Sequence, residues 1–183
     1  SRCSTMKIII LDDIISTGYQ NYIQDIFFNE KFPWFFTPEI STSNDPNSGL
    51  THIIYENNQK SPYFDLVLPI LYEGLYEYNS CCELKELYRI RAGMFVRNQN
   101  NTKVHEKHID LPDIKHYVMI YYIKDSDGPT CLYDGDEIIK KVEPKKGRCV
   151  LFPGEIYHAS TCPRLNSNRM VLNYNFLTYD VQR

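Results

Sequence analysis

Three side chains of metal-binding type occur in a spacing that is typical of a catalytic metal site. His108 and Asp110 are separated by one residue, and His158 follows much later in the chain. In an extended segment, residues i and i+2 point to the same side, so this imidazole and this carboxylate can converge on one ion. Two imidazoles and one carboxylate bind Fe(II) on one side of its coordination sphere and leave positions open for oxygen and a cosubstrate. The set therefore predicts a catalytic rather than a structural metal site.

An arginine shortly after the second histidine supplies a group that can bind an organic acid. Arg169 opens the apolar stretch 170–172, where a solvent-exposed arginine is not expected. A guanidinium group is planar and always charged, and it binds a carboxylate through two parallel hydrogen bonds. We therefore expect a carboxylate-bearing cosubstrate close to the metal.

The remaining histidines offer one alternative ligand. His105 lies close enough in sequence to His108 to replace it as a metal ligand. His116 precedes a predicted strand and is expected on the surface or in a loop. His52 lies in a separate predicted strand, where it is expected to pack or to cap.

Composition describes a globular domain with a balanced surface. The chain has 183 residues, of which 43% are hydrophobic and 23% are charged, and its net charge is −3. No basic run favours nucleic-acid binding, and no apolar stretch is long enough to cross a bilayer. The six cysteines are irregularly spaced, and no signal-peptide pattern is present, so we expect reduced thiols and a cytoplasmic location. Residues 1–5 precede a methionine and are expected to be a cloning remnant.

The periodicity of the sequence changes near residue 84. Before this point, an apolar stripe predicts a helix that is capped by Ser16 or Thr17 and ends at Phe32-Pro33, and a second helix is expected from Ser61-Pro62 to about Tyr78. A polar loop at 37–50 separates them and is a candidate lid, and short strands are expected at 6–11 and 51–56. Alternating short segments follow, at 85–97, 116–123, 130–133, 137–142, 148–152, 157–160 and 169–177. We predict one domain, 6–183, in which 6–84 support a sandwich of strands formed by 85–177.

The stretch from His108 to Phe176 resembles the catalytic core of Fe(II)/2-oxoglutarate-dependent oxygenases of the prolyl 4-hydroxylase-like group. The similar segments are H-I-D, then M-I-Y-Y-I-K-D-S-D-G-P-T, then V-E-P-K-K-G-R-C-V-L-F-P-G-E-I-Y-H and N-R-M-V-L-N-Y-N-F. Upstream, F-P-W and Y-R-I-R-A are similar to small viral and phage members. Lys124 and Pro129 depart from the family pattern, where asparagine and glycine are usual, and this puts the geometry of their loop in doubt.

The resemblance implies a double-stranded β-helix, or jelly roll, and a set of site residues. It implies that His108, Asp110 and His158 bind Fe(II) and that Arg169 binds the distal carboxylate of 2-oxoglutarate. Tyr122 would be the hydroxyl partner of this arginine, although Tyr121 alternates with it and only one of the two can face the site. Asn173 would share the same face of its strand. The implied cofactors are Fe(II), 2-oxoglutarate and O2, with ascorbate as an optional addition.

Three functions are compatible with these residues. The first is hydroxylation of a peptide or protein substrate, with proline as the first candidate and with succinate and CO2 as coproducts. The second keeps this chemistry but acts on a free amino acid, a small metabolite or a nucleobase. The third is a cupin-like metal-binding module without catalysis, which would have no need for a buried carboxylate-binding arginine. A viral source would place the protein in the host cytoplasm, and the sequence leaves the oligomeric state open.

Overall fold

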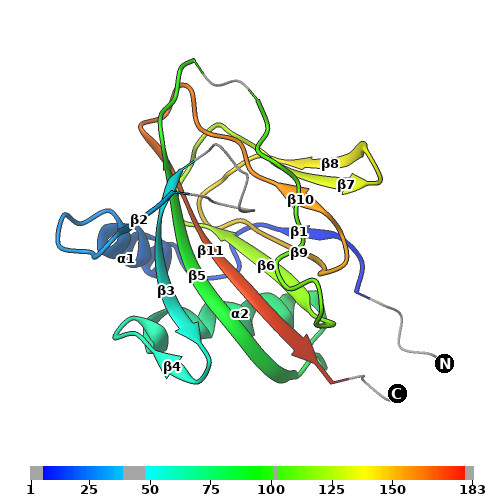
Figure 1. Cartoon of the computed structure of the whole chain (residues 1–183). Coiled ribbons are helices and arrows are strands. Elements are labelled where there is room, and N and C mark those ends of the chain that lie inside the picture. The colour runs from blue at the N-terminus through cyan, green and yellow to red at the C-terminus, as the bar shows by residue number, and fades with distance from the viewer. Residues whose placement is uncertain (1–5, 39–47, 101–102, 180–183) are drawn as a thin grey trace.

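The computed structural model describes residues 6–38, 48–100 and 103–179, and it shows two antiparallel sheets with two helices beside the larger one (Figure 1). The strands are β1 (Ile9–Leu11), β2 (Phe35–Thr37), β3 (Gly49–Glu56), β4 (Gln59–Lys60), β5 (Leu84–Val96), β6 (Tyr117–Tyr122), β7 (Thr130–Asp134), β8 (Glu137–Val142), β9 (Cys149–Pro153), β10 (His158–Ala159) and β11 (Asn168–Thr178). The helices are α1 (Thr17–Phe27) and α2 (Phe64–Tyr78). The predicted class, mostly β with supporting helices near the N-terminus, is confirmed. The expected cloning remnant, 1–5, lies outside the described residues.

The larger sheet has the strand order β1-β9-β6-β11-β5-β3-β2, with β4 paired to β3, and the smaller sheet has the order β10-β7-β8. The two sheets form the jelly roll expected from the resemblance. The long strand β11 lies between β5 and β6, so residues from distant parts of the chain meet along it.

Side chains of β11 alternate between two environments, as the pleat of a strand requires. Met170, Leu172 and Tyr174 point toward the helices and belong to the main hydrophobic core. Arg169 and Asn173 lie on the other side of the strand, where they line a pocket between the sheets. A second, smaller core fills the remaining space between the sheets. This alternation lets one strand support both the core and the site.

The helices begin and end for local reasons. Ser16 caps α1, because its Oγ accepts a hydrogen bond from the backbone N–H of Tyr19 at 3.2 Å. The helix ends at Phe27, earlier than predicted, and the chain turns back so that the ring of Phe32 packs 4.6 Å from that of Phe27. The second helix begins at Phe64 rather than at Ser61-Pro62, because a hydrogen-bonded turn at Ser61 precedes it.

The first half of the chain also contributes strands to the larger sheet. The predicted strands near the N-terminus and at 51–56 are present as β1 and β3, which pair with β9 and β5. The short strands β2 and β4 were not predicted, because each has too few residues to show an alternating pattern. Within the described part of the chain, neither helix is long and apolar enough to cross a membrane.

Candidate metal centre and cosubstrate pocket

Three side chains converge at one end of the space between the sheets. His108 lies on the segment between β5 and β6, and it forms an isolated bridge with His158 of β10. The N–H of His108 donates to the carbonyl of His158 at 2.9 Å, and the N–H of His158 donates to the carbonyl of His108 at 3.0 Å. Their Nε2 atoms lie 3.2 Å and 3.4 Å from Oδ1 of Asp110. The three potential ligand atoms all lie within 4.8 Å of one another.

One carboxylate oxygen of Asp110 is buried and accepts no hydrogen bond from any described residue. This atom, Oδ1, faces the two histidines. The other oxygen, Oδ2, accepts hydrogen bonds from Nδ2 of Asn173 at 3.0 Å and from Nδ2 of Asn175 at 2.8 Å. A buried polar atom without a partner is costly, so a cation that binds Oδ1 would relieve this cost. The residues present therefore fit a divalent metal ion.

The charge state of Asp110 also suits a metal ligand. Burial raises the pKa of this carboxyl group, but the neighbouring His158 and His108 outweigh burial and hold its pKa well below the usual value. The group is therefore ionised at neutral pH and available as an anionic ligand. Arg89 adds a further positive charge, with Nη2 lying 3.8 Å from Oδ1.

The other histidines lie outside this group. His105 is buried, with Nδ1 3.2 Å from Oγ of Ser160 and Nε2 3.2 Å from Sγ of Cys162. It therefore contacts one wall of the pocket instead of completing the ligand set.

His116 lies in the loop before β6, as expected, but its side chain is buried and not on the surface. Its Nδ1 lies 2.7 Å from the carbonyl of Ile114, and its ring packs over Gly154. A Cβ atom at position 154 would lie only 2.4 Å from Nε2, so glycine is what gives this ring its space. His52 packs between aromatic rings, and its Nδ1 lies 2.8 Å from the carbonyl of Pro33, in line with the expected packing or capping role.

Arg169 is buried and held in place by two hydrogen bonds. Its Nε donates to the carbonyl of Gly128 at 2.8 Å, and its Nη2 donates to Oγ1 of Thr130 at 2.7 Å. Burial lowers the pKa of the guanidinium group, although the ordinary value lies so high that the group stays charged. Among the described residues, no carboxylate forms an ion pair with it. A buried cation that has no counterion among these residues favours the binding of an anionic ligand.

The loop that carries Gly128 is held in place by hydrogen bonds and close backbone contacts. This glycine has φ of +88°, and a Cβ atom there would lie 2.6 Å from the carbonyl oxygen of Thr161, so no other residue fits. Asp127 accepts hydrogen bonds from the backbone N–H groups of residues 164–166. Lys124, one departure from the family pattern, donates to Asn168 Oδ1 at 3.0 Å. The carbonyl that orients Arg169 is therefore fixed by its own loop.

Tyr122, not Tyr121, lies on the side of Arg169. The Tyr122 ring centre lies 5.7 Å from Cζ of Arg169, and its hydroxyl donates to Oγ1 of Thr130 at 2.7 Å. Burial raises the pKa of Tyr122, so the hydroxyl stays protonated. Tyr121 points into the core beneath the helices.

Asn173 shares the face of Arg169, as expected from their positions in one strand. It lines the pocket, but its amide donates to Asp110 rather than to Arg169. In this structure it positions the carboxylate of Asp110, a candidate metal ligand.

Two site residues, Thr130 and Asn175, were not predicted from the sequence. Thr130 connects Arg169 to Tyr122, and Asn175 binds Asp110. Arg89 donates from Nε to Oδ1 of Asn175 at 3.0 Å, which orients that amide. Only the position of Asn175 on the same face as Asn173 could have drawn attention to it.

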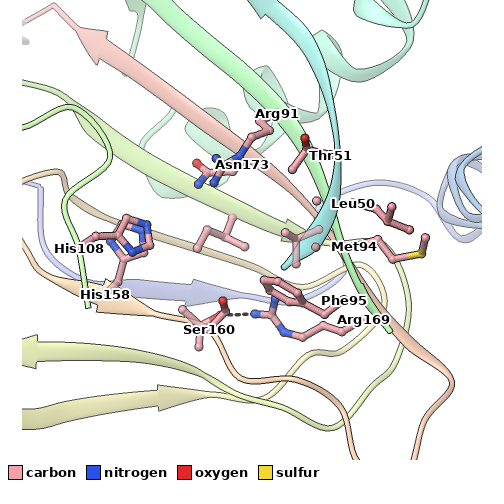
Figure 2. Close-up of a pocket in the computed structure, with 15 residues that line it drawn as sticks. Leu50, Thr51, Arg91, Met94, Phe95, His108, His158, Ser160, Arg169 and Asn173 are labelled. Atoms are coloured by element: carbon pink, nitrogen blue, oxygen red, sulfur yellow. Dashed lines mark hydrogen bonds between the residues drawn. The ribbon is translucent and has the colours of Figure 1, made fainter. Parts of the chain in front are cut away.

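One pocket is lined by His108 and His158, and it contains an arginine at each of its two ends (Figure 2). Arg169, Phe95 and Ser160 lie at one end, and Arg91 and Asn173 lie at the other, with the two histidines beside the space between them. The complete lining is Gly49, Leu50, Thr51, Arg91, Gly93, Met94, Phe95, His108, Ile120, Thr130, His158, Ser160, Arg169, Val171 and Asn173. The predicted lid falls mainly on residues 39–47, which lie outside the described residues, whereas its last two positions, Gly49 and Leu50, begin β3 and line the pocket.

Comparison with known proteins identifies the fold. No protein-family model matches the sequence, and no curated protein matches it. Among solved structures, an oxidoreductase of the 2OG-Fe(II) oxygenase family from Burkholderia pseudomallei is similar with a TM-score of 0.68 and 10% identity, over 92% of this chain and 84% of that one.

Two further similar structures are of enzymes that are named for different reactions. A prolyl hydroxylase from Trichoplax adhaerens, in complex with a hypoxia inducible factor peptide fragment, has a TM-score of 0.62 and 12% identity, over 92% of this chain and 83% of that one. The non-heme alpha ketoglutarate dependent carbocyclase SnoK from nogalamycin biosynthesis has a TM-score of 0.65 and 11% identity, over 92% of this chain and 78% of that one. The chain therefore has the fold of the 2-oxoglutarate- and Fe(II)-dependent oxygenases.

Proposed function

We propose that this protein is an Fe(II)- and 2-oxoglutarate-dependent dioxygenase that hydroxylates a peptidyl substrate, with a prolyl residue as the first candidate. The observation that carries the proposal is the convergence of Oδ1 of Asp110, which has no hydrogen-bond partner among the described residues, with His108 and His158, two histidines that share a pocket with a buried arginine. Three protein ligands on one side leave the other side of the metal open for a cosubstrate and oxygen.

Each residue of the pocket has a defined task in this proposal. The two histidines and Asp110 would hold Fe(II), while Asn173 and Asn175 keep the carboxylate turned toward it. Arg169 would bind the distal carboxylate of 2-oxoglutarate, and the hydroxyl groups of Thr130 and Tyr122 lie beside this arginine. When bound, Fe(II) and 2-oxoglutarate supply an oxidation in which O2 is consumed, 2-oxoglutarate becomes succinate and CO2, and one oxygen atom enters a C–H bond of the substrate.

The protein also limits access of water to the reacting atoms. Ile120, Val171 and Phe95 form apolar walls of the pocket that also contains His108, His158 and Arg169. Such walls lower the local dielectric and strengthen the interaction of the guanidinium with a carboxylate. The buried position of Arg169 also argues against a metal-binding module without catalysis, which would not need such a charge.

Two of the similar structures suggest different substrates. The prolyl hydroxylase is named with a bound peptide, which supports a peptidyl substrate, and the carbocyclase is named from the biosynthesis of a small molecule, which supports the alternative of a metabolite. We place the peptide first because the resemblance in the sequence is to prolyl hydroxylases.

The test is succinate formation from 2-oxoglutarate by the purified chain with Fe(II), alone and with proline-containing peptides or free amino acids. We expect His108→Ala, Asp110→Ala and His158→Ala each to lower activity and bound iron steeply, because a three-ligand site has no redundancy. His105→Ala is the matched control and should keep both. Iron binding that depends on His105 but not on His108 would refute the ligand assignment. Mass spectrometry identifies the substrate, and oxygen insertion into a metabolite but into no peptide would select the alternative.

A further inference from the structure

A second arginine in the pocket has no hydrogen-bonding partner among the residues that the structure describes. Arg91 lies on β5, lines the pocket and is only partly exposed. Among the described residues, none forms a hydrogen bond or an ion pair with its guanidinium group. Burial and the neighbouring Arg89 lower its pKa by more than the carboxylates of Asp110 and Glu56 raise it, so its charge is only partly compensated. A cation left in this state on a pocket wall indicates a missing anionic ligand.

The other polar groups near Arg91 are already occupied. Thr51 Oγ1 lies 2.7 Å from Thr37 Oγ1, and Asn173 donates its amide to Asp110. Arg89 binds Asn175 and lies near Asp110, so it serves the metal-binding carboxylate. Arg91 is therefore the charged group at this end of the pocket that remains available to a ligand.

The position of Arg91 separates it from the predicted cosubstrate site. Arg91, Gly93 and Phe95 occupy the same face of β5, and they pair across to Asn173, Val171 and Arg169 of β11 in that order. Figure 2 accordingly shows Arg91 beside Asn173, at the end opposite Arg169. Gly93 lies between them without a side chain, and a Cβ atom there would find only Val171, at 3.8 Å. The pocket thus has space between two guanidinium groups, with the metal-binding side chains beside it.

The formal charges point to the same assignment. Fe(II) and Arg169 together would balance Asp110 and the two carboxylates of 2-oxoglutarate. The positive charges of Arg89 and Arg91 then remain, and Glu56 is the acidic group besides Asp110 that acts on Arg91. One negative charge is still needed to balance this end of the pocket.

We propose that Arg91 is a specificity-determining residue that binds a carboxylate group of the substrate. This inference rests on the proposed function and narrows its substrate to carboxylate-bearing molecules. The carboxylate can belong to an acidic residue next to the target in a peptide, or to a free amino acid. A planar guanidinium binds either one through paired hydrogen bonds.

The experiment compares carboxylate probes with their uncharged amide analogues. Binding is measured by calorimetry under anaerobic conditions, with Fe(II) and 2-oxoglutarate present so that no turnover occurs. One pair is a terminally blocked peptide with proline followed by Glu or by Gln, and the other pair is L-proline and L-prolinamide. For the parent chain, we expect the carboxylate member of one pair to bind about 10- to 100-fold more tightly, as for a charge-assisted hydrogen bond. The pair that shows the difference identifies the source of the carboxylate.

Variants then assign the preference to one residue. Arg91→Met should bring the ratio of the two dissociation constants close to one, and Arg91→Lys should give an intermediate ratio. Arg97→Met, at an exposed arginine just beyond the same strand, is the matched control and should keep the parent ratio. Absence of a preference in both pairs, or a preference that survives in Arg91→Met, overturns the inference. A preference that depends on Arg91 in a protein that never forms succinate would instead refute the proposed function and leave this inference standing.

Discussion

Single residues determine what this pocket can bind, and their roles depend on contacts between strands. Asp110 has one oxygen held by two amides and the other directed at two imidazoles. The pattern of His108, Asp110 and His158 predicted this convergence, because metal ligands require particular residue types. The supporting residues Asn175 and Thr130 could not be predicted in the same way, since their roles arise from side-chain hydrogen bonds to residues far apart in sequence.

At this scale, the role of Arg169 can be separated from iron binding. Arg169→Lys keeps the positive charge but loses the planar fork, so the dissociation constant for 2-oxoglutarate should rise about 10- to 100-fold. Iron affinity, measured without 2-oxoglutarate, should stay within about twofold of the parent, because Arg169 does not contact Asp110. Calorimetric titrations measure both quantities, and Arg148→Lys, at a surface ion pair with Asp12, is the control. An equal loss of both affinities would indicate that Arg169 supports the fold instead.

Elements of the structure were predicted best where their pattern is long. The alternating segments that became β5, β6 and β11 were identified with errors of only a residue or two at their ends. The end of α1 and the burial of His116 were not predicted, because tertiary contacts with Phe32 and Gly154 decide them. The loop between β6 and β7 departs from the family pattern at Lys124 and Pro129, yet its hydrogen bonds hold Gly128 in place.

Asp127 makes the stability of this loop dependent on pH. Burial raises the pKa of its carboxyl group, but the hydrogen bonds from residues 164–166 outweigh burial and lower it well below the usual value. A lowered folded-state pKa stabilises the protein above the unfolded pKa of about 4, and this contribution is lost as the pH falls below that value. Asp127→Asn should therefore lower the free energy of unfolding at pH 7. At pH 3, the difference in this free energy between the variant and the parent should be smaller. Urea unfolding at several pH values measures this, and a difference that does not change with pH would contradict it.

The whole molecule depends on one core between the helices and the larger sheet. Leu71 of α2 and Tyr174 of β11 are fully buried in it, and the hydroxyl of Tyr174 donates to the carbonyl of Val67 at 2.7 Å. The change of sequence period near residue 84 suggested two halves within one domain. The pairing of β1 with β9 and of β3 with β5 joins those halves in one sheet, so we still expect them to unfold together.

Leu71→Ala tests this expectation, because the cavity it creates should lower the unfolding free energy by about 2–5 kcal/mol. Tyr72→Ala, at an exposed position of the same helix, should change it by less than about 0.5 kcal/mol. Urea unfolding is followed by the fluorescence of Trp34, the single tryptophan, and by far-ultraviolet circular dichroism. Coincident transitions are expected for a single cooperative unit, and separate transitions would show that the two halves unfold independently.

The backbone bridge between His108 and His158 has a consequence for the motions of the protein. Each of these residues donates its amide hydrogen to the other, and each is also a predicted metal ligand. A bound ion would therefore act as a cross-link between the segment before β6 and the smaller sheet, and opening of the bridge would require release of the ion. Amide hydrogen exchange at His108 and His158 should slow when Fe(II) or Mn(II) is added under anaerobic conditions, while exchange in α2 stays the same. Equal exchange rates with and without metal would show that the bridge and the ion are independent.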